Sequence, residues 1–257
     1  MLLLPPLLLA AALFSLQPSQ LPLTPLDVHC PSVQSARYIG RQGWGYINSG
    51  GTGVVYGSPD SSAVLKVART GSENRVAHEC EMINYVNSKI SGDVKYKDLK
   101  FVKCLDQCSV NSADKGILMT PLIPPSFVST FDSLHDDIAR KAVDNTLRIL
   151  DLLLSSGVVL TDLQLLIGPE TGDVYLIDLT ESALENRSPS LPGVQLVLRH
   201  ESRDLAVIRT DWPASRFNLV SEVVSQVPQR LQEYMLTRMR DGFAENPTIK
   251  AYVDEVF

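Results

Sequence analysis

The 257-residue sequence lacks several features that would assign it to a functional class at once. It has no run of basic residues and its net charge is −6, so nucleic-acid binding is not expected. Beyond the N-terminal leader, no apolar stretch reaches the ~18 residues of a membrane span, so we expect no such span in the mature chain. The histidines have no paired spacing, so we expect them to be structural or solvated rather than metal ligands.

The first 26 residues carry no charged side chain. Residues 2–16 form a nearly continuous apolar run, and residues 17–25 are polar and rich in proline. This order predicts a signal peptide or leader over residues 1–25, although its start has no lysine or arginine. The protein would then be secreted or lumenal in the secretory pathway. An uncleaved membrane anchor or an organelle leader is the alternative.

The remaining sequence has enough hydrophobic residues for a real core, and we divide it into a linker over residues 26–37 and a domain over residues 38–257. Its N-terminal part predicts a strand over residues 38–46, then a glycine-rich turn within residues 47–56. Such a turn lets backbone N–H groups approach phosphate oxygens closely. It has no G-K-[ST] of a Walker loop, and no helix follows it as in a dinucleotide fingerprint. An ordinary hairpin tip is the alternative.

A lysine stands among apolar residues on the second strand of a predicted hairpin, residues 54–56 and 63–68. A buried ammonium requires a partner, whereas a lysine at a sheet edge is merely solvated. The helical period of residues 73–90 places Glu79 at the head of the inward face. We therefore expect Glu79 to pair with Lys66.

The rest of the domain predicts more strands and then mostly helices. Residues 99–110 and 116–119 indicate strands, and prolines at 121, 124 and 125 predict a hinge over residues 120–126. Asp136–Ser156 has aliphatic residues at helical spacing, and Gly157 ends it. Further on, the pattern predicts a loop over residues 181–200. Helical segments are then predicted at residues 204–209, 216–226, 229–241 and 249–256.

Two aspartates follow apolar, β-prone runs in residues 158–180. The turn signal at residues 168–172 separates the runs 163–167 and 174–177, which predict a hairpin. Such a hairpin would bring the carboxylates of Asp162 and Asp178 to one edge. By itself, the pattern is also typical of aspartates that only cap strand ends.

Together, these features resemble the protein-kinase fold over most of residues 38–240. The family's loop, G-x-G-x-x-G-x-V, is matched with the first glycine replaced, by Asn48, Gly50, Gly53 and Val55. Lys66 and Glu79 match its phosphate-binding lysine and helix glutamate. Leu-Thr-Asp-Leu at residues 160–163 stands in place of H-R-D-L, and Asp-Leu-Thr at residues 178–180 in place of D-F-G. Asp204 matches a buried aspartate of the C-terminal lobe.

The resemblance implies an α+β, two-lobed fold, with a mostly β N-lobe with one helix over about residues 38–120 and a mostly helical C-lobe over about residues 127–257. It implies ATP with Mg²⁺ or Mn²⁺ as cofactor. It also implies catalytic roles for Asp162 as base, Lys66 on the phosphates and Asp178 on the metal. The residues implied in ATP binding are Asn48, Gly50, Gly51, Gly53, Val55, Lys66, Glu79, Met119 and Gln164.

The departures from the family pattern leave the activity open. Without the arginine before Asp162, activation by loop phosphorylation is not expected. Ile167 takes the position of the metal-binding asparagine and cannot ligate Mg²⁺, so we expect Ile167→Asn to raise activity and Gln164 to assist Asp178. The hypotheses are a weak phosphotransferase acting on protein hydroxyls, a catalytically inactive pseudokinase acting as a secreted binding or regulatory protein, and a small-molecule kinase. The protein substrate or binding partner is unknown.

The cysteines at positions 30, 80, 104 and 108 indicate disulfides in a secreted chain. Three full pairings are possible. We expect Cys104 to be bonded to Cys108, or alternatively to Cys30. Cys80, on the inward face of a helix, is expected to be a small buried apolar residue with a free thiol.

Overall fold

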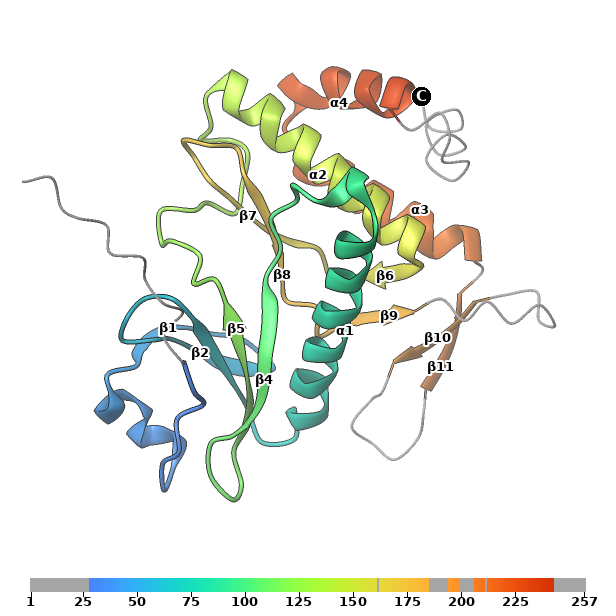
Figure 1. Ribbon diagram of the computed structural model, residues 1–257. Helices are drawn as coiled ribbons and strands as arrows, with labels where there is room; N and C mark the ends of the chain where they lie inside the picture. The colour runs from blue at the N-terminus through green and yellow to red at the C-terminus, as the bar shows by residue number, and fades with distance from the viewer. Residues whose placement is uncertain (1–27, 161, 185–193, 199–205, 211, 243–257) are drawn as a thin grey trace, which may run out of the picture.

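The computed structural model describes residues 28–160, 162–184, 194–198, 206–210 and 212–242 (Figure 1). It is an α+β fold built on a five-stranded antiparallel sheet with strand order β1-β2-β3-β5-β4. The strands of the sheet are β1 (Gly45–Ser49), β2 (Gly53–Gly57), β3 (Val64–Ala68), β4 (Lys103–Ser109) and β5 (Lys115–Thr120). A short 3₁₀ helix, η1 (Ala36–Gln42), precedes the sheet.

Helix α1 (Glu73–Gly92) connects β3 to the second half of the sheet and packs against one face of it (Figure 1). Val76, Ile83 and Val86 are almost fully buried on its inward face. These residues recur at helical spacing, so the amphipathic pattern of the sequence dictates which face meets the sheet. The opposite face of the sheet covers a second core that contains Ile39 and Trp44.

In the described residues, the C-terminal half is mostly helical and carries three two-stranded sheets. Helix α2 (Asp136–Ser156) packs against α1 and against two later helices, α3 (Trp212–Gln226) and α4 (Gln229–Gly242). It ends at Gly157, whose φ of 70° is the left-handed conformation that favours glycine. The two-stranded sheets pair β6 (Val158–Leu160) with β9 (Ser182–Leu184), β7 (Gln164–Ile167) with β8 (Val174–Ile177), and β10 (Val194–Leu198) with β11 (Ala206–Thr210).

The β7–β8 hairpin is attached to the segments on both sides of β4 and β5. Phe101, just before β4, forms a parallel bridge with Leu176. Val128, in the connection from β5 to α2, exchanges two backbone hydrogen bonds with Ile167. These contacts fix the hairpin, and with it the residue that follows Ile177, relative to the large sheet.

Several predicted elements are confirmed and others are corrected. The helices at residues 73–90, 136–156, 216–226 and 229–241 are present within a few residues, and so are the hairpins that carry Lys66 and Asp178. The predicted strand at 38–46 is wrong at its start, because residues 36–42 form η1 and β1 begins only at Gly45.

The region after residue 180 departs furthest from the expectation. The predicted loop at 181–200 contains β9 and β10, and the predicted helix at 204–209 overlaps β11 instead. A short apolar run does not distinguish a strand from a helix, and here the pairing of β10 with β11 decides. Asp204, residues 1–25 and the turn expected at 249–256 lie outside the described residues.

The two disulfides join other cysteines than expected. Cys30 is bonded to Cys108, and Cys80 to Cys104. The expectation that Cys104 is oxidised is thus confirmed, but both partners proposed for it are wrong, and so is the free thiol at Cys80. Cys104 and Cys108 would share one face of a regular strand. A register shift between Cys104 and Asp106 reverses that alternation, so Cys104 faces α1 and Cys108 the second core.

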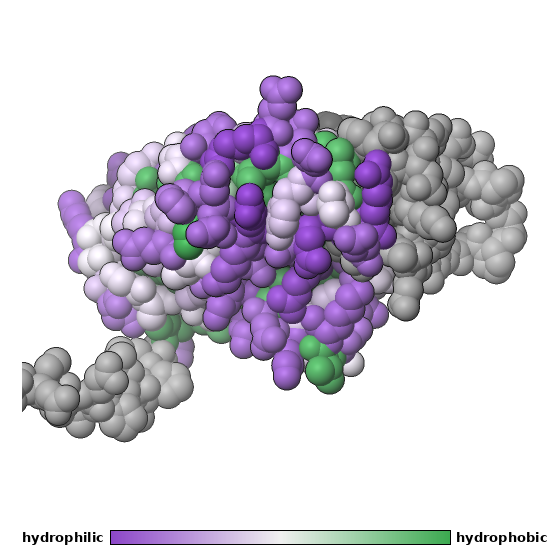
Figure 2. All heavy atoms as spheres, turned by 90° about the horizontal axis from the view of Figure 1, so that it is seen from above, coloured by the Kyte–Doolittle hydropathy of each residue, from purple (hydrophilic) through white to green (hydrophobic). Residues whose placement is uncertain are grey.

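No helix in the described part of the chain is long and apolar enough to cross a membrane. Figure 2 shows the molecule of Figure 1 from its top. This surface is mainly hydrophilic, and its hydrophobic residues form small, separate areas. The two disulfides are consistent with an extracellular or lumenal protein, since such bonds persist in oxidising compartments.

Candidate functional site

Lys66 lies between two carboxylates contributed by distant parts of the chain. Its Nζ is 2.8 Å from Glu79 Oε2 and 3.0 Å from Asp178 Oδ1. The lysine is on β3, the glutamate on α1, and the aspartate directly follows β8. The expected pairing of Lys66 with Glu79 is therefore present, and Asp178 joins it.

The alternation of β3 determines which way Lys66 points. Leu65 and Val67 belong to the second core, so Lys66 between them faces α1. The first two turns of α1 present Glu79 to it, and the neighbouring Cys80 is bonded to Cys104 on β4. The disulfide ties the helix to the sheet one residue from the ion pair.

Burial makes the charges of this cluster strongly interdependent. Burial disfavours the ammonium of Lys66, but Glu79 and Asp178 outweigh it and raise the pKa of Lys66. Desolvation raises the pKa of Glu79, whose side chain is 2% exposed, although Lys66 opposes that shift. For Asp178, the desolvation that would raise its pKa is outweighed by Lys66 and Thr180, so its pKa is lowered. With both carboxylates ionised, the cluster carries one net negative charge, which favours a cation beside it.

Asp178 combines an unusual backbone with an open carboxylate oxygen. Its φ is 58°, a left-handed conformation that costs energy for a residue other than glycine, although aspartate tolerates it best. The Thr180 hydroxyl donates to Oδ1 over 2.5 Å, and Lys66 donates to the same oxygen. Among the described residues none donates to Oδ2, and the side chain is 29% exposed. One oxygen is therefore available to a ligand.

The glycine-rich turn lies beside Lys66. The Gly50 N–H donates to the Gly53 carbonyl, and Arg69 donates from Nε to the Gly50 carbonyl over 2.8 Å. A Cβ on Gly53 would lie 2.8 Å from the Val67 carbonyl oxygen and 3.2 Å from Lys66 Cγ, so only glycine fits there.

The steric reason that requires glycine at position 53 does not apply to Gly50 and Gly51. A Cβ on either would meet nothing within 4 Å, and neither glycine has a positive φ. The fold itself therefore does not explain glycine at these two positions. Their backbone carries no side chain and borders open space at the tip of the turn. Backbone N–H groups that bind phosphate oxygens require such space.

Asp162 and Gln164 lie at the end of the β7–β8 hairpin that carries Asp178. Gln164 is paired with Ile177, the residue before Asp178, and its Nε2 donates to Asp162 Oδ2 over 2.6 Å. Asp162 is exposed. The expected approach of the two aspartates to one edge is thus consistent with the register of the hairpin.

Helix α3 holds the backbone next to Asp162. Glu222 accepts a hydrogen bond from the Leu163 N–H over 2.7 Å, and Gln226 donates to the Leu163 carbonyl over 2.8 Å. No motif in the sequence marks these two positioning residues. Both lie about sixty residues downstream, and no local pattern links them to the aspartate.

Ile167 is not near Asp178, contrary to the expectation that it occupies a metal-ligand position. It pairs with Val174 at the far end of the hairpin, about 10 Å along the strand from Gln164. Its side chain is completely buried in the main core. At the end of the hairpin next to Asp178, the side chain with an oxygen that could ligate a metal is therefore the amide of Gln164 and not Ile167.

The other residues implied in ATP binding have ordinary structural partners. Asn48 accepts from the Ser49 N–H, and Val55 pairs with Lys66 across the β2–β3 ladder. Met119 is 9% exposed and packs in the main core at the end of β5. Nucleotide contact at these positions stays a prediction.

Among the described residues, no group of three or more His, Cys, Asp or Glu side chains is arranged to hold a metal. A cation at Asp178 would thus need oxygen ligands from elsewhere, such as the amide of Gln164, water and phosphate. Comparison of the sequence with protein-family models and with curated proteins gives no match.

Proposed function

We propose that this chain binds ATP with a divalent cation and is a divergent, weak phosphotransferase of the protein-kinase-like type that acts on protein hydroxyls. The observation that carries the proposal is the position of Lys66 between Glu79 and Asp178. In protein kinases, a lysine on the third strand pairs with a glutamate on the following helix, and both this pair and the metal-binding aspartate must be in place. Here the same residue types come from β3, from the helix after β3 and from the end of a later hairpin.

The chain's own residues would divide the work as follows. Lys66 is held charged by two carboxylates and would bind phosphate oxygens as a fixed cation. Gly50 and Gly51 would offer backbone N–H groups from the turn. ATP supplies the phosphoryl group that is transferred, and catalysis of this transfer depends mostly on positioning and electrostatic stabilisation.

Fewer side chains than usual would coordinate the metal. Asp178 Oδ2 and the Gln164 amide oxygen are the two side-chain oxygens at this end of the hairpin that could ligate Mg²⁺ or Mn²⁺. Asp162 would accept the proton of the attacking hydroxyl, because it is exposed and its Oδ1 is free of hydrogen bonds from the described residues. An incomplete set of metal ligands accounts for the expectation that transfer is slow.

In the finer fold that we propose, residues 38–120 form an N-lobe, residues 120–126 a hinge and residues 127–257 a C-lobe. The β-sheet with α1 before residue 120 and the helices α2, α3 and α4 after it support this division. We propose further that residues 1–25 direct the chain into the secretory pathway, and the two disulfides support this localisation.

A non-catalytic binding protein on the same scaffold is the second candidate. The hydrogen bond from Gln164 to Asp162 favours it, because that bond occupies one oxygen of the candidate base and stabilises its carboxylate. A pseudokinase would keep the Lys66 cluster for nucleotide binding or for stability alone.

The test is the thermal stability of the purified mature chain with nucleotide, followed by phosphoryl transfer. A ligand at 100 times its Kd adds about 2.7 kcal/mol to the free energy of unfolding. Since each kcal/mol moves the Tm of a chain this size by about 2–4 °C, saturating Mg-ATP should raise Tm by several degrees.

Radiolabelled γ-phosphate transfer to casein or to the chain itself, with Mg²⁺ and with Mn²⁺, then separates the two candidates. Transfer that disappears in Asp162→Ala supports the phosphotransferase. A Tm shift without transfer supports the non-catalytic protein, and no shift with any nucleotide or cation would refute both forms of ATP binding.

A further inference from the structure

Lysines gather around the connection between α1 and β4, on the opposite end of α1 from Glu79. Residues 89–103 contain five lysines and two aspartates, whereas the whole chain has a net charge of −6. The segment includes the last turn of α1, the 3₁₀ helix η2 (Val94–Tyr96) and the start of β4. Its lysines are Lys89, Lys95, Lys97, Lys100 and Lys103.

Only Lys95 among these five has an acidic partner in the described part of the chain, and Lys89 lies over the Tyr85 ring instead. Lys95 pairs with the buried Asp151, 2.5 Å away, and so anchors the segment to α2. Lys97, Lys100 and Lys103 are exposed and form no ion pair with a described residue. Their charges are therefore available to an external group.

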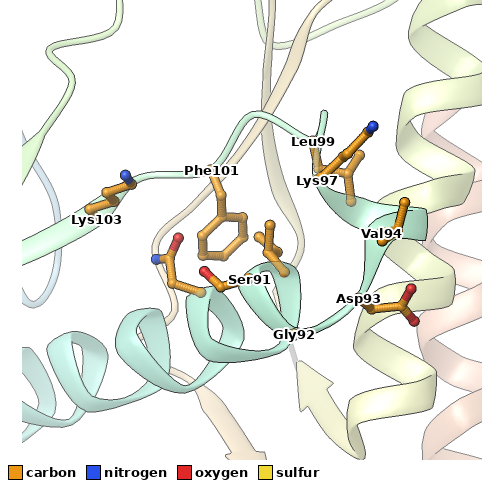
Figure 3. Close-up of a pocket in the computed structure, with 10 residues that line it drawn as sticks. Ser91, Gly92, Asp93, Val94, Lys97, Leu99, Phe101 and Lys103 are labelled. Carbon is orange, nitrogen blue, oxygen red and sulfur yellow. The ribbon is translucent and has the colours of Figure 1, made fainter.

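Two hollows lie on either side of this segment and share Leu99 as a wall. The first, which we call the α1–β4 hollow, has a volume of about 390 Å³. Its apolar part is formed by Phe101, Leu99 and Ile90, and Lys97 and Lys103 stand on opposite sides of the Phe101 ring (Figure 3). Val94, on the rim, is 78% exposed.

The second hollow, of about 320 Å³, extends the positive surface onto α2. Lys100, Lys141 and Arg148 line it, against Asp98 and Asp173. Arg148 is held in place because its guanidinium donates to the Lys95 carbonyl over 2.9 Å. The two hollows thus adjoin at Leu99. Asp93 also lines the first, and in the second Lys141 is paired with Asp173 over 3.8 Å, so that Lys97, Lys103, Lys100 and Arg148 remain as the cations for an external group.

We propose that this surface is a docking site for a short, extended acidic segment of a partner protein. An apolar side chain of the segment would enter the α1–β4 hollow against Phe101, and carboxylates on both sides of it would pair with Lys97 and Lys103. Further carboxylates would reach Lys100 and Arg148 in the second hollow. Complementary charge fixes the register of such a segment and speeds its association.

The surface favours a protein segment over a polyanion such as nucleic acid. The apolar part of the α1–β4 hollow, formed by Phe101, Leu99 and Ile90, suits a hydrocarbon side chain and offers no hydrogen bond to phosphate. The net charge of −6 would also repel a long polyanion before it reached the lysines.

The docking site is separate from the candidate nucleotide site. Glu79 and Asn87, the first residue of the hollow, are about 12 Å apart along α1. The inference therefore does not rest on the proposed function, and it can be tested on a chain that binds no nucleotide.

The experiment is fluorescence anisotropy of the purified mature chain with a labelled peptide in which glutamates and aspartates flank one leucine. We expect binding that weakens with salt, and a loss of about tenfold or more in affinity for Lys97→Glu/Lys103→Glu. Val94→Ser, at an exposed rim residue, should weaken binding less. The charge-matched control is Lys115→Glu/Arg240→Glu, two exposed cations outside both hollows, and it should bind as the wild type does.

The comparison probes are the same peptide with serine for leucine, a single-stranded oligonucleotide of equal charge, and vesicles that contain an anionic lipid. Weaker binding of all three supports the proposal. It is overturned if the wild type does not bind the leucine peptide, if the control variant loses as much affinity as the hollow variant, or if any comparison probe binds equally well.

Discussion

Lys66 Nζ lies 3.0 Å from Asp178 Oδ1, although 112 residues separate the two in sequence. Only the packing of the β7–β8 hairpin against the sheet brings them together. Glu79 completes the cluster from a third element, and the consequences of this three-residue arrangement can be measured in several ways.

Lys66→Met should both destabilise the protein and abolish the rise in Tm caused by Mg-ATP. The substitution leaves the buried Glu79 without its cation, and breaking a buried pair on one side costs about 3–5 kcal/mol. The double variant Lys66→Met/Glu79→Gln should recover much of that stability without recovering nucleotide binding. Urea denaturation and thermal melts measure both effects. If the double variant responds to Mg-ATP as the wild type does, Lys66 does not bind the phosphates.

Gly50→Ala and Gly51→Ala should leave the free energy of unfolding within about 1 kcal/mol of the wild type, because both positions have open space and no positive φ. Each should nevertheless weaken nucleotide binding if the turn holds phosphate through its bare backbone. Gly40→Ala, at another glycine with no neighbour within 4 Å, is the matched control. Isothermal titration with Mg-ATP measures the affinities, and unchanged affinity in both turn variants would contradict a phosphate-binding turn.

Removal of the Cys80–Cys104 disulfide should affect nucleotide binding more than removal of the other disulfide. In the chain-entropy model, its loss costs about 3.5 kcal/mol for a sequence separation of 24. Because Cys80 adjoins Glu79, the alanine pair should also loosen α1 and weaken nucleotide binding. The control pair, Cys30→Ala/Cys108→Ala, lies on the other face and should lower stability but not affinity. Equal affinities in the two pairs would show that the disulfide does not position Glu79.

The pH dependence of stability should report the buried carboxyl of Glu79. Desolvation raises its pKa above 4.5, so the folded chain holds this proton to a higher pH than the unfolded chain does. Its contribution to stability is thus most favourable below pH 4.5 and decreases as the pH rises through the folded pKa.

The free energy of unfolding of the wild type minus that of Glu79→Gln should therefore fall as the pH rises from 4.5. Urea denaturation over a pH series measures this difference. Glu81→Gln, at an exposed glutamate of the same helix, controls for the loss of one surface charge. A difference that rises with pH would mean that Lys66 outweighs burial at Glu79.

Ile167→Asn should destabilise the protein by about 3–5 kcal/mol and should not improve metal binding, since it places an amide in the main core. Gln164→Ala should instead weaken Mn²⁺-dependent nucleotide binding with little change in stability, because Gln164 is only partly buried. Urea denaturation and titration with Mn-ATP distinguish the two. A gain of nucleotide affinity in Ile167→Asn would support the original expectation that residue 167 occupies a metal-ligand position.

The sequence by itself determined the elements with strong local signals. The helical periods of α1 and α2, the left-handed Gly157 and the turns of the hairpins are all legible in short windows, because neighbouring residues create them. The pairing of Lys66 with Glu79 followed from the same logic, since a buried lysine requires a carboxylate and one helix face offered it.

Only the tertiary structure decided the relationships that depend on register and on distant packing. The bulge in β4 sends Cys104 and Cys108 to opposite faces, and the β7–β8 register places Gln164 rather than Ile167 beside Asp178. A shift of one residue reverses the face of a strand, yet spacing in the sequence does not reveal where such a shift occurs. The hydrogen bonds of α3 with the Leu163 backbone likewise come from packing, because a local sequence pattern does not indicate a partner some sixty residues away.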